Sequence, residues 1–322
     1  MDNYKLAVET VSKRFDKEDI YYSVFVLCLY GLLNVFDDYK DIVLDIFLKV
    51  NILIDNKKII DILNDNEFNT STYFGLADDN DDFMTCGISS NGINYEFDGE
   101  KFLLDEDVSF IAISLIDMDI NHLLLAIIHE LAHLVKGYTN VTYTYKNDTE
   151  TGYYLRSGVN IFNCSYDYNK KEVYYRNSYN LLDEVINCQH TTEAANYILE
   201  LEGFIPEGEV LELFNVLDKD IFKTDFGYSN FNNLFSNLWK NDVFREIINK
   251  NIIIGFIDEI KDDYEEIMGE NSFLELNDLL EIYDKLLSED DDEKGIKEIE
   301  ERFENLIFIF NEKVKEVKYI KC

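Results

Sequence analysis

The chain has 322 residues, of which 65 are acidic and 29 basic, and its formal net charge at pH 7 is -36. Such a surface repels the phosphates of nucleic acids and anionic lipids, so we expect neither nucleic acid nor membrane as a partner. The charge serves solubility and also favours basic peptide or protein partners by electrostatic steering. A hydrophobic share of 47% and a single proline predict a packed globular chain.

The cysteines are scattered, odd in number and form no CxxC pair: Cys28, Cys86, Cys164, Cys188 and Cys322. We therefore expect neither a disulfide framework nor a cysteine-based zinc site. Free thiols suit a reducing compartment. The N-terminus lacks the basic region and apolar run of a signal peptide, and the apolar stretch Tyr21–Phe36 is too short to span a bilayer. These features predict a cytoplasmic protein.

The first 65 residues have the apolar spacing of helices. Val24–Leu33 is strongly apolar, and the helical pattern of Asp41–Val50 is predicted to continue into Ile59–Leu63. Strand patterns follow. The pairs Asn91-Gly92 and Asp98-Gly99 predict two hairpin turns, and the apolar, β-branched run Val108–Leu115 predicts a buried strand.

Two helices are predicted beyond this strand. The first, capped by Asp119 or Asn121, should run to about Lys136, and the second should span 181–201 and end at Gly203. Between them, strands are predicted at 141–145, 153–162 and 172–175. Residues 207–322 are helical in pattern, with one apolar stripe formed by Ile296, Ile299, Phe303, Leu306, Ile307 and Phe310.

The first of these helices carries the motif His129-Glu130-Leu131-Ala132-His133. Two histidines four residues apart project from one face of a helix and can bind one zinc ion. Glu130 lies about 100° round the helix from His129, where it can act as general base on water activated by the metal. The surrounding residues are nearly all apolar, so these polar groups are predicted to be buried and to need partners.

A catalytic zinc needs a third protein ligand, and the downstream helix offers Glu184, His190 and Glu193. We favour Glu184 because it stands among apolar residues, where a buried carboxylate needs a partner. Peptide hydrolysis also needs a group that stabilises the developing oxyanion. Tyr179 is preferred for this role because it lies just before the Glu184 helix. The other candidates are Tyr174, Tyr175, Arg156 and His190.

With these residues, the chain resembles the gluzincin clan of zinc metallopeptidases. It is more narrowly similar to intracellular gluzincin-like proteins of low-GC Gram-positive bacteria, in which an Arg-x-Gly segment precedes an Asn-Glu-containing helix. Arg156-Ser157-Gly158 and Asp183-Glu184 stand in those places. The resemblance covers roughly residues 108–200, with the HExxH motif as its specific part. It implies that His129, His133 and Glu184 are the metal ligands and Glu130 the catalytic base.

The sequence departs from this pattern at two positions. Asp183 replaces the asparagine, and Cys188 stands where an acidic residue is common. A carboxylate that orients a ligand histidine is therefore expected elsewhere, with Asp183 as the candidate. The resemblance also implies that an extended substrate lies beside the strand Val108–Leu115.

We therefore expect an α+β, predominantly helical protein. A zincin-like catalytic core at 69–203, with a small mixed sheet, would be flanked by an N-terminal helical segment, 1–68, and a C-terminal helical subdomain, 204–322.

The predicted function is a zinc metalloendopeptidase acting on peptides or proteins. Residues 191–200 are also similar to a helix of regulatory metallopeptidases that cleave repressors. The alternative is a non-catalytic helical interaction protein with a structural or vestigial metal site. The oligomeric state stays open.

Overall fold

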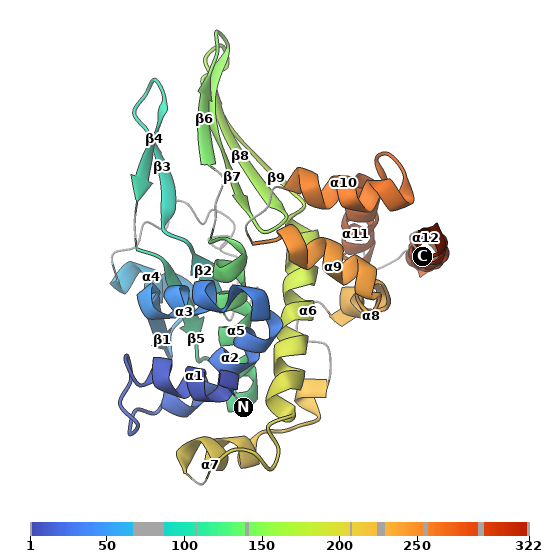
Figure 1. The fold of residues 1–322 in the computed structure, drawn as a ribbon. Coiled ribbons are helices and arrows are strands. Elements are labelled where there is room, and N and C mark those ends of the chain that lie inside the picture. Colours follow the sequence, from blue (N-terminus) through green and yellow to red (C-terminus); the bar gives the residue numbers. More distant parts are fainter. Residues whose placement is uncertain are drawn as a thin grey trace.

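The computed structural model describes residues 2–66, 87–106, 108–138, 142–206, 208–223, 229–253, 257–288 and 293–320. Within these ranges the protein is mixed α+β, with helices predominating over small sheets, as expected (Figure 1). The N-terminal part contains helices α1 (Asp2–Val11), α2 (Tyr22–Val35), α3 (Lys40–Lys49) and α4 (Ile59–Asp65), and strand β1 (Asn51–Asp55). The helical prediction for this part was therefore wrong at β1.

A three-stranded sheet forms the centre of the N-terminal half. Strand β5 (Phe110–Ser114) pairs in parallel with β1 on one side and antiparallel with β2 (Gly87–Ser90) on the other. Side chains alternate between the two faces of a strand, so Phe110 and Ala112 pack against α4 while Ile111 and Ile113 enter the main core. The predicted strand is thus buried, but it is central in this sheet, and the edge beside it is β2.

The Asn91-Gly92 prediction of a hairpin was wrong. Strand β3 (Ile93–Phe97) follows that pair but bonds to β4 (Phe102–Glu106), whereas β2 bonds to β5. The Asp98-Gly99 prediction is confirmed, because the β3–β4 turn lies there and Gly99 has a φ of 96°. That left-handed conformation suits glycine, which has no Cβ.

A four-stranded antiparallel sheet projects from the body of the molecule (Figure 1). It consists of β6 (Thr142–Lys146), β7 (Glu150–Ser157), β8 (Asn160–Asp167) and β9 (Glu172–Ser178). The single strand predicted at 153–162 is in fact a hairpin, because the chain reverses at Gly158, where φ is 60°. Aromatic rings from the β3–β4 ribbon pack on this sheet, with Tyr95 stacked on Tyr153 at 4.1 Å.

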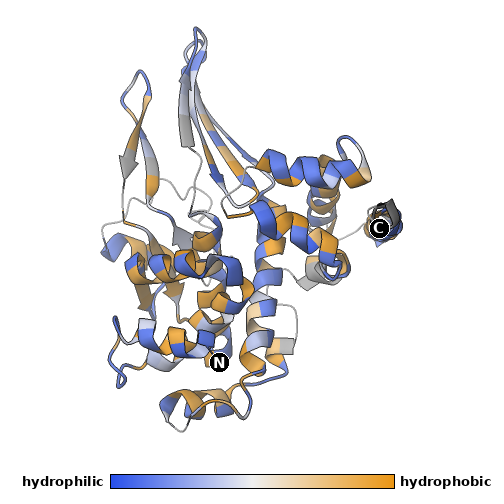
Figure 2. Cartoon of the chain, viewed as in Figure 1, coloured by the Kyte–Doolittle hydropathy of each residue, from blue (hydrophilic) through white to orange (hydrophobic). Residues whose placement is uncertain are grey.

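Two long helices, α5 (Ile120–Lys136) and α6 (Asn180–Leu199), lie next to each other beside the apolar helix α2. Figure 2 shows apolar residues gathered in the helices around the three-stranded sheet. Helix α2 is buried on nearly every side, and Gly31 allows it to approach α6, because a Cβ there would stand 2.9 Å from the Ala194 carbonyl oxygen. Helices α5 and α6 confirm the two helices predicted beyond the buried strand, and each end lies within two residues of its predicted position.

Asp119 caps the N-terminus of α5. Its Oδ1 accepts hydrogen bonds from the backbone N–H groups of Asn121 and His122, both at 2.9 Å. Asp119→Ala should lower the free energy of unfolding by about 1 kcal/mol, because those donors lose their partner. Urea denaturation should show this loss, and Asp119→Ser, which keeps a capping oxygen, should retain most of the stability. Equal losses in the two variants would contradict the capping role.

The C-terminal part is helical, as predicted. It contains α7 (Glu209–Val216), α8 (Ser229–Trp239), α9 (Asp242–Asn251), α10 (Ile257–Met268), α11 (Ser272–Ser288) and α12 (Glu293–Ile320). The apolar stripe predicted for α12 packs into the core, with Phe303 and Phe310 almost fully buried. The proposed boundary between 68 and 69 and the cysteines Cys86 and Cys322 lie outside the described residues.

Candidate metal centre

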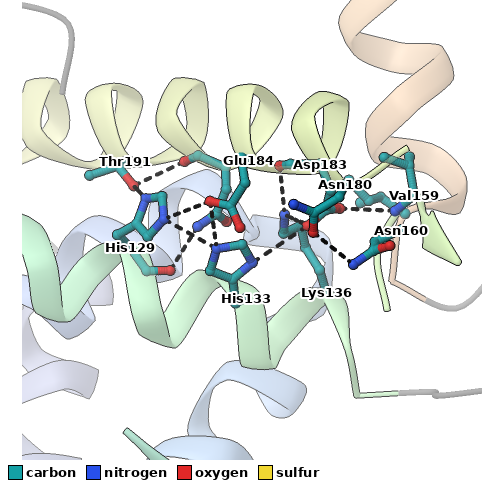
Figure 3. Close-up of polar contacts among 12 residues, drawn as sticks. His129, His133, Lys136, Val159, Asn160, Asn180, Asp183, Glu184 and Thr191 are labelled. Carbon is teal, nitrogen blue, oxygen red and sulfur yellow. Dashed lines mark hydrogen bonds and ion pairs between the residues drawn. The ribbon is translucent and has the colours of Figure 1, made fainter. Parts of the chain in front are cut away.

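His129, His133 and Glu184 bring three ligand atoms to one point between α5 and α6 (Figure 3). The Nε2 atoms of the two histidines are 3.1 Å apart. The Glu184 Oε2 lies 3.3 Å from each of them. The three atoms thus form a nearly equilateral triangle.

The size of this triangle fits a tetrahedral metal ion. Ligand atoms about 2.0–2.1 Å from a tetrahedrally coordinated zinc are separated from one another by about 3.3–3.4 Å. The side chains of His129, His133 and Glu184 are 11%, 18% and 23% exposed. The site is therefore enclosed without being sealed, and two imidazoles plus one carboxylate match the donor set of catalytic zinc sites that leave one position open.

The two helices position the ligands by their spacing and packing. His129 and His133 are one helical turn apart on α5, so their rings stand over the same face. Helix α6 packs along that face and presents Glu184 from its first turns. Of the three candidates for third ligand, the structure brings Glu184 to the histidines.

Asp183 orients His133 from the opposite side of the ring. Its Oδ2 is 3.5 Å from the His133 Nδ1 and accepts a hydrogen bond of 2.9 Å from the Lys136 Nζ. Its Oδ1 accepts a hydrogen bond of 2.9 Å from the Val159 backbone N–H. A carboxylate at Nδ1 favours the tautomer whose Nε2 lone pair faces the metal. The structure thus puts Asp183 where the sequence analysis sought an orienting carboxylate.

The charges at this site shift several pKa values. Burial alone would lower the pKa of His133, but the Glu184 and Asp183 carboxylates outweigh it and raise that pKa to about 10. Burial alone would raise the pKa of Asp183, but Lys136 and His133 bring it down to about 2. The pKa of Glu184 is likewise well below its usual range, because the two histidines outweigh its desolvation. The carboxylates are therefore ionised at neutral pH, whereas a metal ion would have to displace the proton from His133, because metal ligation needs the neutral imidazole.

His129 is held through its backbone and its ring. The Asn187 side-chain amide donates to the His129 carbonyl oxygen at 2.8 Å. The Thr191 hydroxyl lies 3.5 Å from the His129 Nδ1 and donates to the Asn187 carbonyl at 2.9 Å. These contacts tie the histidine-bearing turn of α5 to the middle of α6.

Glu130 lies against the edge strand β2. Its side chain is buried, and a Cβ added to Gly87 would stand 2.9 Å from its Oε1. Glycine at this position therefore leaves room for the carboxylate between α5 and β2. The motif glutamate thus sits beside β2, which is the last strand of this sheet among the described residues, and it follows His129 directly in the sequence.

The other two candidates for third ligand lie elsewhere. The His190 Nε2 is 2.9 Å from the Asn249 Oδ1, and its ring packs against Phe36 and Trp239. Complete burial lowers its pKa to about 3, so it is neutral. Glu193 accepts a hydrogen bond of 3.0 Å from the Trp239 indole N–H. Both residues serve the packing between α6 and the C-terminal helices.

Tyr179 does not point over the histidine pair, contrary to our expectation. It adopts a left-handed conformation, with φ at 65°, and its ring packs on Phe273 of α11 at 5.5 Å. The alternatives are also engaged: Tyr174 donates to Glu172, and Arg156 donates to backbone carbonyls. The structure therefore assigns Tyr179 a packing contact with the C-terminal helices.

Sequence reasoning missed three residues that shape the site: Lys136, Asn187 and Gly87. Lys136 had a detectable signal, since it lies three residues after His133 on a buried helix and its charge needed a partner. Asn187 and Gly87 gave none, because their roles depend on which elements become neighbours. His122, by contrast, lies outside the site, and its Nδ1 is 2.8 Å from the Asp119 Oδ1.

No family model, curated protein or solved structure matches the chain. Within the described ranges, no helix is both long enough and apolar enough to cross a bilayer. The functional argument therefore starts from the geometry of the His129–His133–Glu184 cluster.

Proposed function

We propose that the protein is a zinc-dependent metallopeptidase whose metal is held by His129, His133 and Glu184. The observation that carries the proposal is the triangle of ligand atoms with sides of 3.1, 3.3 and 3.3 Å. Those separations suit a tetrahedral zinc with one open position. The HExxH spacing and the carboxylate of Asp183 behind His133 support it further.

Each residue of the site has a separate role in the proposed hydrolysis. Zinc bound here would supply a Lewis acid that makes water acidic enough to react near neutral pH. Glu130, next to a ligand histidine and beside β2, is the general base that removes the proton from the attacking water. Asp183 holds His133 in the required tautomer, and Asn187 fixes the turn that carries His129.

We further propose a zincin-like core built from the three-stranded sheet with α5 and α6, and peptides or proteins as substrates. The net charge of -36 favours basic segments among them. We place the protein in the cytoplasm, since Cys28 and Cys164 are buried cysteines outside any disulfide, as suits a reducing compartment.

Zinc stoichiometry tests the metal site. The protein purified without chelators should contain one zinc per chain, and His133→Ala should lose it, because two ligands cannot hold the ion firmly. His122→Ala is the matched control, since His122 lies on the same helix but is exposed and contacts Asp119. Elemental analysis of the three proteins measures this directly.

Two outcomes would contradict the proposal. Wild-type protein that binds no zinc even when zinc is supplied would favour the alternative of a helical interaction protein with a vestigial site. Zinc that survives His133→Ala would show that the metal binds elsewhere.

A further inference from the structure

Arg156 joins the C-terminal helices to the turn between β7 and β8. Its buried guanidinium donates through one Nη to the Asn251 carbonyl at 3.1 Å and to the Ile252 carbonyl at 3.4 Å. These carbonyls end helix α9, where backbone acceptors lack helical partners and the helix dipole favours a cation. Its Nε donates to the Gly158 carbonyl at 2.7 Å. One side chain thus holds both a helix end and a tight turn.

That turn in turn holds Asp183. The Val159 N–H donates to the Asp183 Oδ1 (Figure 3). Gly158 packs so closely against Asp183 that a Cβ there would overlap the same oxygen. The other oxygen of Asp183 faces the His133 Nδ1. A continuous path of contacts therefore runs from the end of α9 through Arg156, the turn and Asp183 to His133.

We propose that Arg156 is a positioning residue through which the C-terminal helices control how tightly the site retains its metal. The inference rests on the metal-binding part of the proposed function and adds a regulatory input to it. When α9 is docked, Arg156 fixes the turn, the turn fixes Asp183, and Asp183 keeps His133 aimed at the ion. Any partner or change that moves the end of α9 loosens this support.

The same helix offers a matched control. Arg245 of α9 lies 3.7 Å from Glu193 of α6, so it also links α9 to α6. Glu193 contacts Trp239 and lies nine residues along α6 from Glu184. Removing Arg245 therefore weakens the contact between α9 and α6 without touching the path to His133.

Zinc affinity, measured by competition with a chelator, tests the proposal. Arg156→Met should weaken zinc binding by about tenfold, in line with the loss of an outer partner of a metal ligand. Arg156→Lys should fall between Met and wild type, because lysine keeps the charge but not the planar fork. Arg245→Met should bind zinc as wild type does. The visible absorption of the Co²⁺-loaded protein should change in Arg156→Met and not in Arg245→Met, which a general loss of stability would not produce.

Hydrogen exchange of the wild-type protein gives a second test that needs no variant. The control amide is that of Val243, which donates to the Asn241 side chain at the start of α9. If the path couples the β7–β8 turn to the metal, zinc must slow hydrogen exchange of the Val159 amide more than that of the Val243 amide. Equal zinc affinity in wild type and Arg156→Met, or equal slowing at both amides, overturns the inference. Wild-type protein without zinc affinity overturns the proposed function instead.

Discussion

Lys136→Met is expected to lower the free energy of unfolding by about 3–5 kcal/mol, because it leaves one half of a buried ion pair without its partner. The Lys136 side chain is completely buried, and that of Asp183 is 5% exposed. The Lys136 ammonium donates both to the Asp183 carboxylate and to its backbone carbonyl. Methionine fills the space but removes the ammonium that neutralises the buried Asp183 carboxylate. Urea denaturation of the zinc-free protein measures the loss.

The control for this substitution is Lys5→Met. Lys5 also pairs with a carboxylate, Glu9, at 3.7 Å, but its side chain is 80% exposed. Exposed pairs contribute about 0–1 kcal/mol, so this variant should unfold almost as wild type does. Similar losses at Lys136 and Lys5 would contradict the structural role assigned to the buried pair.

The pH dependence of the Lys136→Met effect follows from Asp183. Its pKa of about 2 in the folded protein lies below the unfolded value of about 3.9. The stability contributed by its ionised form is therefore present above pH ~4 and is lost as the pH falls towards 2. The difference in stability between wild type and Lys136→Met should narrow across that range, as unfolding curves at a series of pH values can show.

The site helices were predictable because their signals are local. Asp119, the apolar run and the HExxH spacing all lie within one segment, so the cap, the helix and the shared face of His129 and His133 follow from sequence alone. Glu184 was also chosen from local sequence, because an acidic residue among apolar neighbours is expected to face the interior of the protein. In the structure α6 packs against α5 there, so Glu184 faces the histidine-bearing helix.

Pairing between distant segments was not predictable in this way. Strand β1 follows α3 directly, and its five residues carry no turn signal that separates them from the helical pattern. Its partner β5 lies more than fifty residues away, so only tertiary contact marks it as a strand. Likewise, Asn91-Gly92 permits a hairpin, but β2 pairs instead with β5, where Gly87 leaves room for the Glu130 side chain.

The directions of individual side chains could not be predicted from the sequence either. Tyr179 precedes the Glu184 helix, but its left-handed backbone turns the ring towards Phe273. The position of Tyr179 in the sequence thus indicated that it lies near the Glu184 helix, but it did not indicate the direction of its side chain. Arg156 was singled out by the resemblance, as part of the Arg-x-Gly segment. Its hydrogen-bond partners at the end of α9 lie far away in the sequence, so they could not be predicted.

Glu130→Gln should sharply slow peptide cleavage while leaving zinc in place. Glutamine has nearly the shape of glutamate and fits the space beside Gly87, but its amide cannot accept the proton of the attacking water. General bases contribute about 10²–10⁴-fold to the rate, so cleavage of a peptide library rich in lysine and arginine should fall by that factor. Zinc content should stay at one per chain, since Glu130 is not part of the ligand triangle.

Glu193→Gln is the matched control for this prediction. It makes the same chemical change at another largely buried glutamate, whose carboxylate contacts Trp239 rather than the metal ligands. This variant should keep both zinc and turnover, so a defect confined to Glu130→Gln isolates the proton transfer from general damage. Full cleavage by a zinc-loaded Glu130→Gln protein would remove Glu130 as the base, and hydrolysis at this site would then require another acceptor within reach of the water.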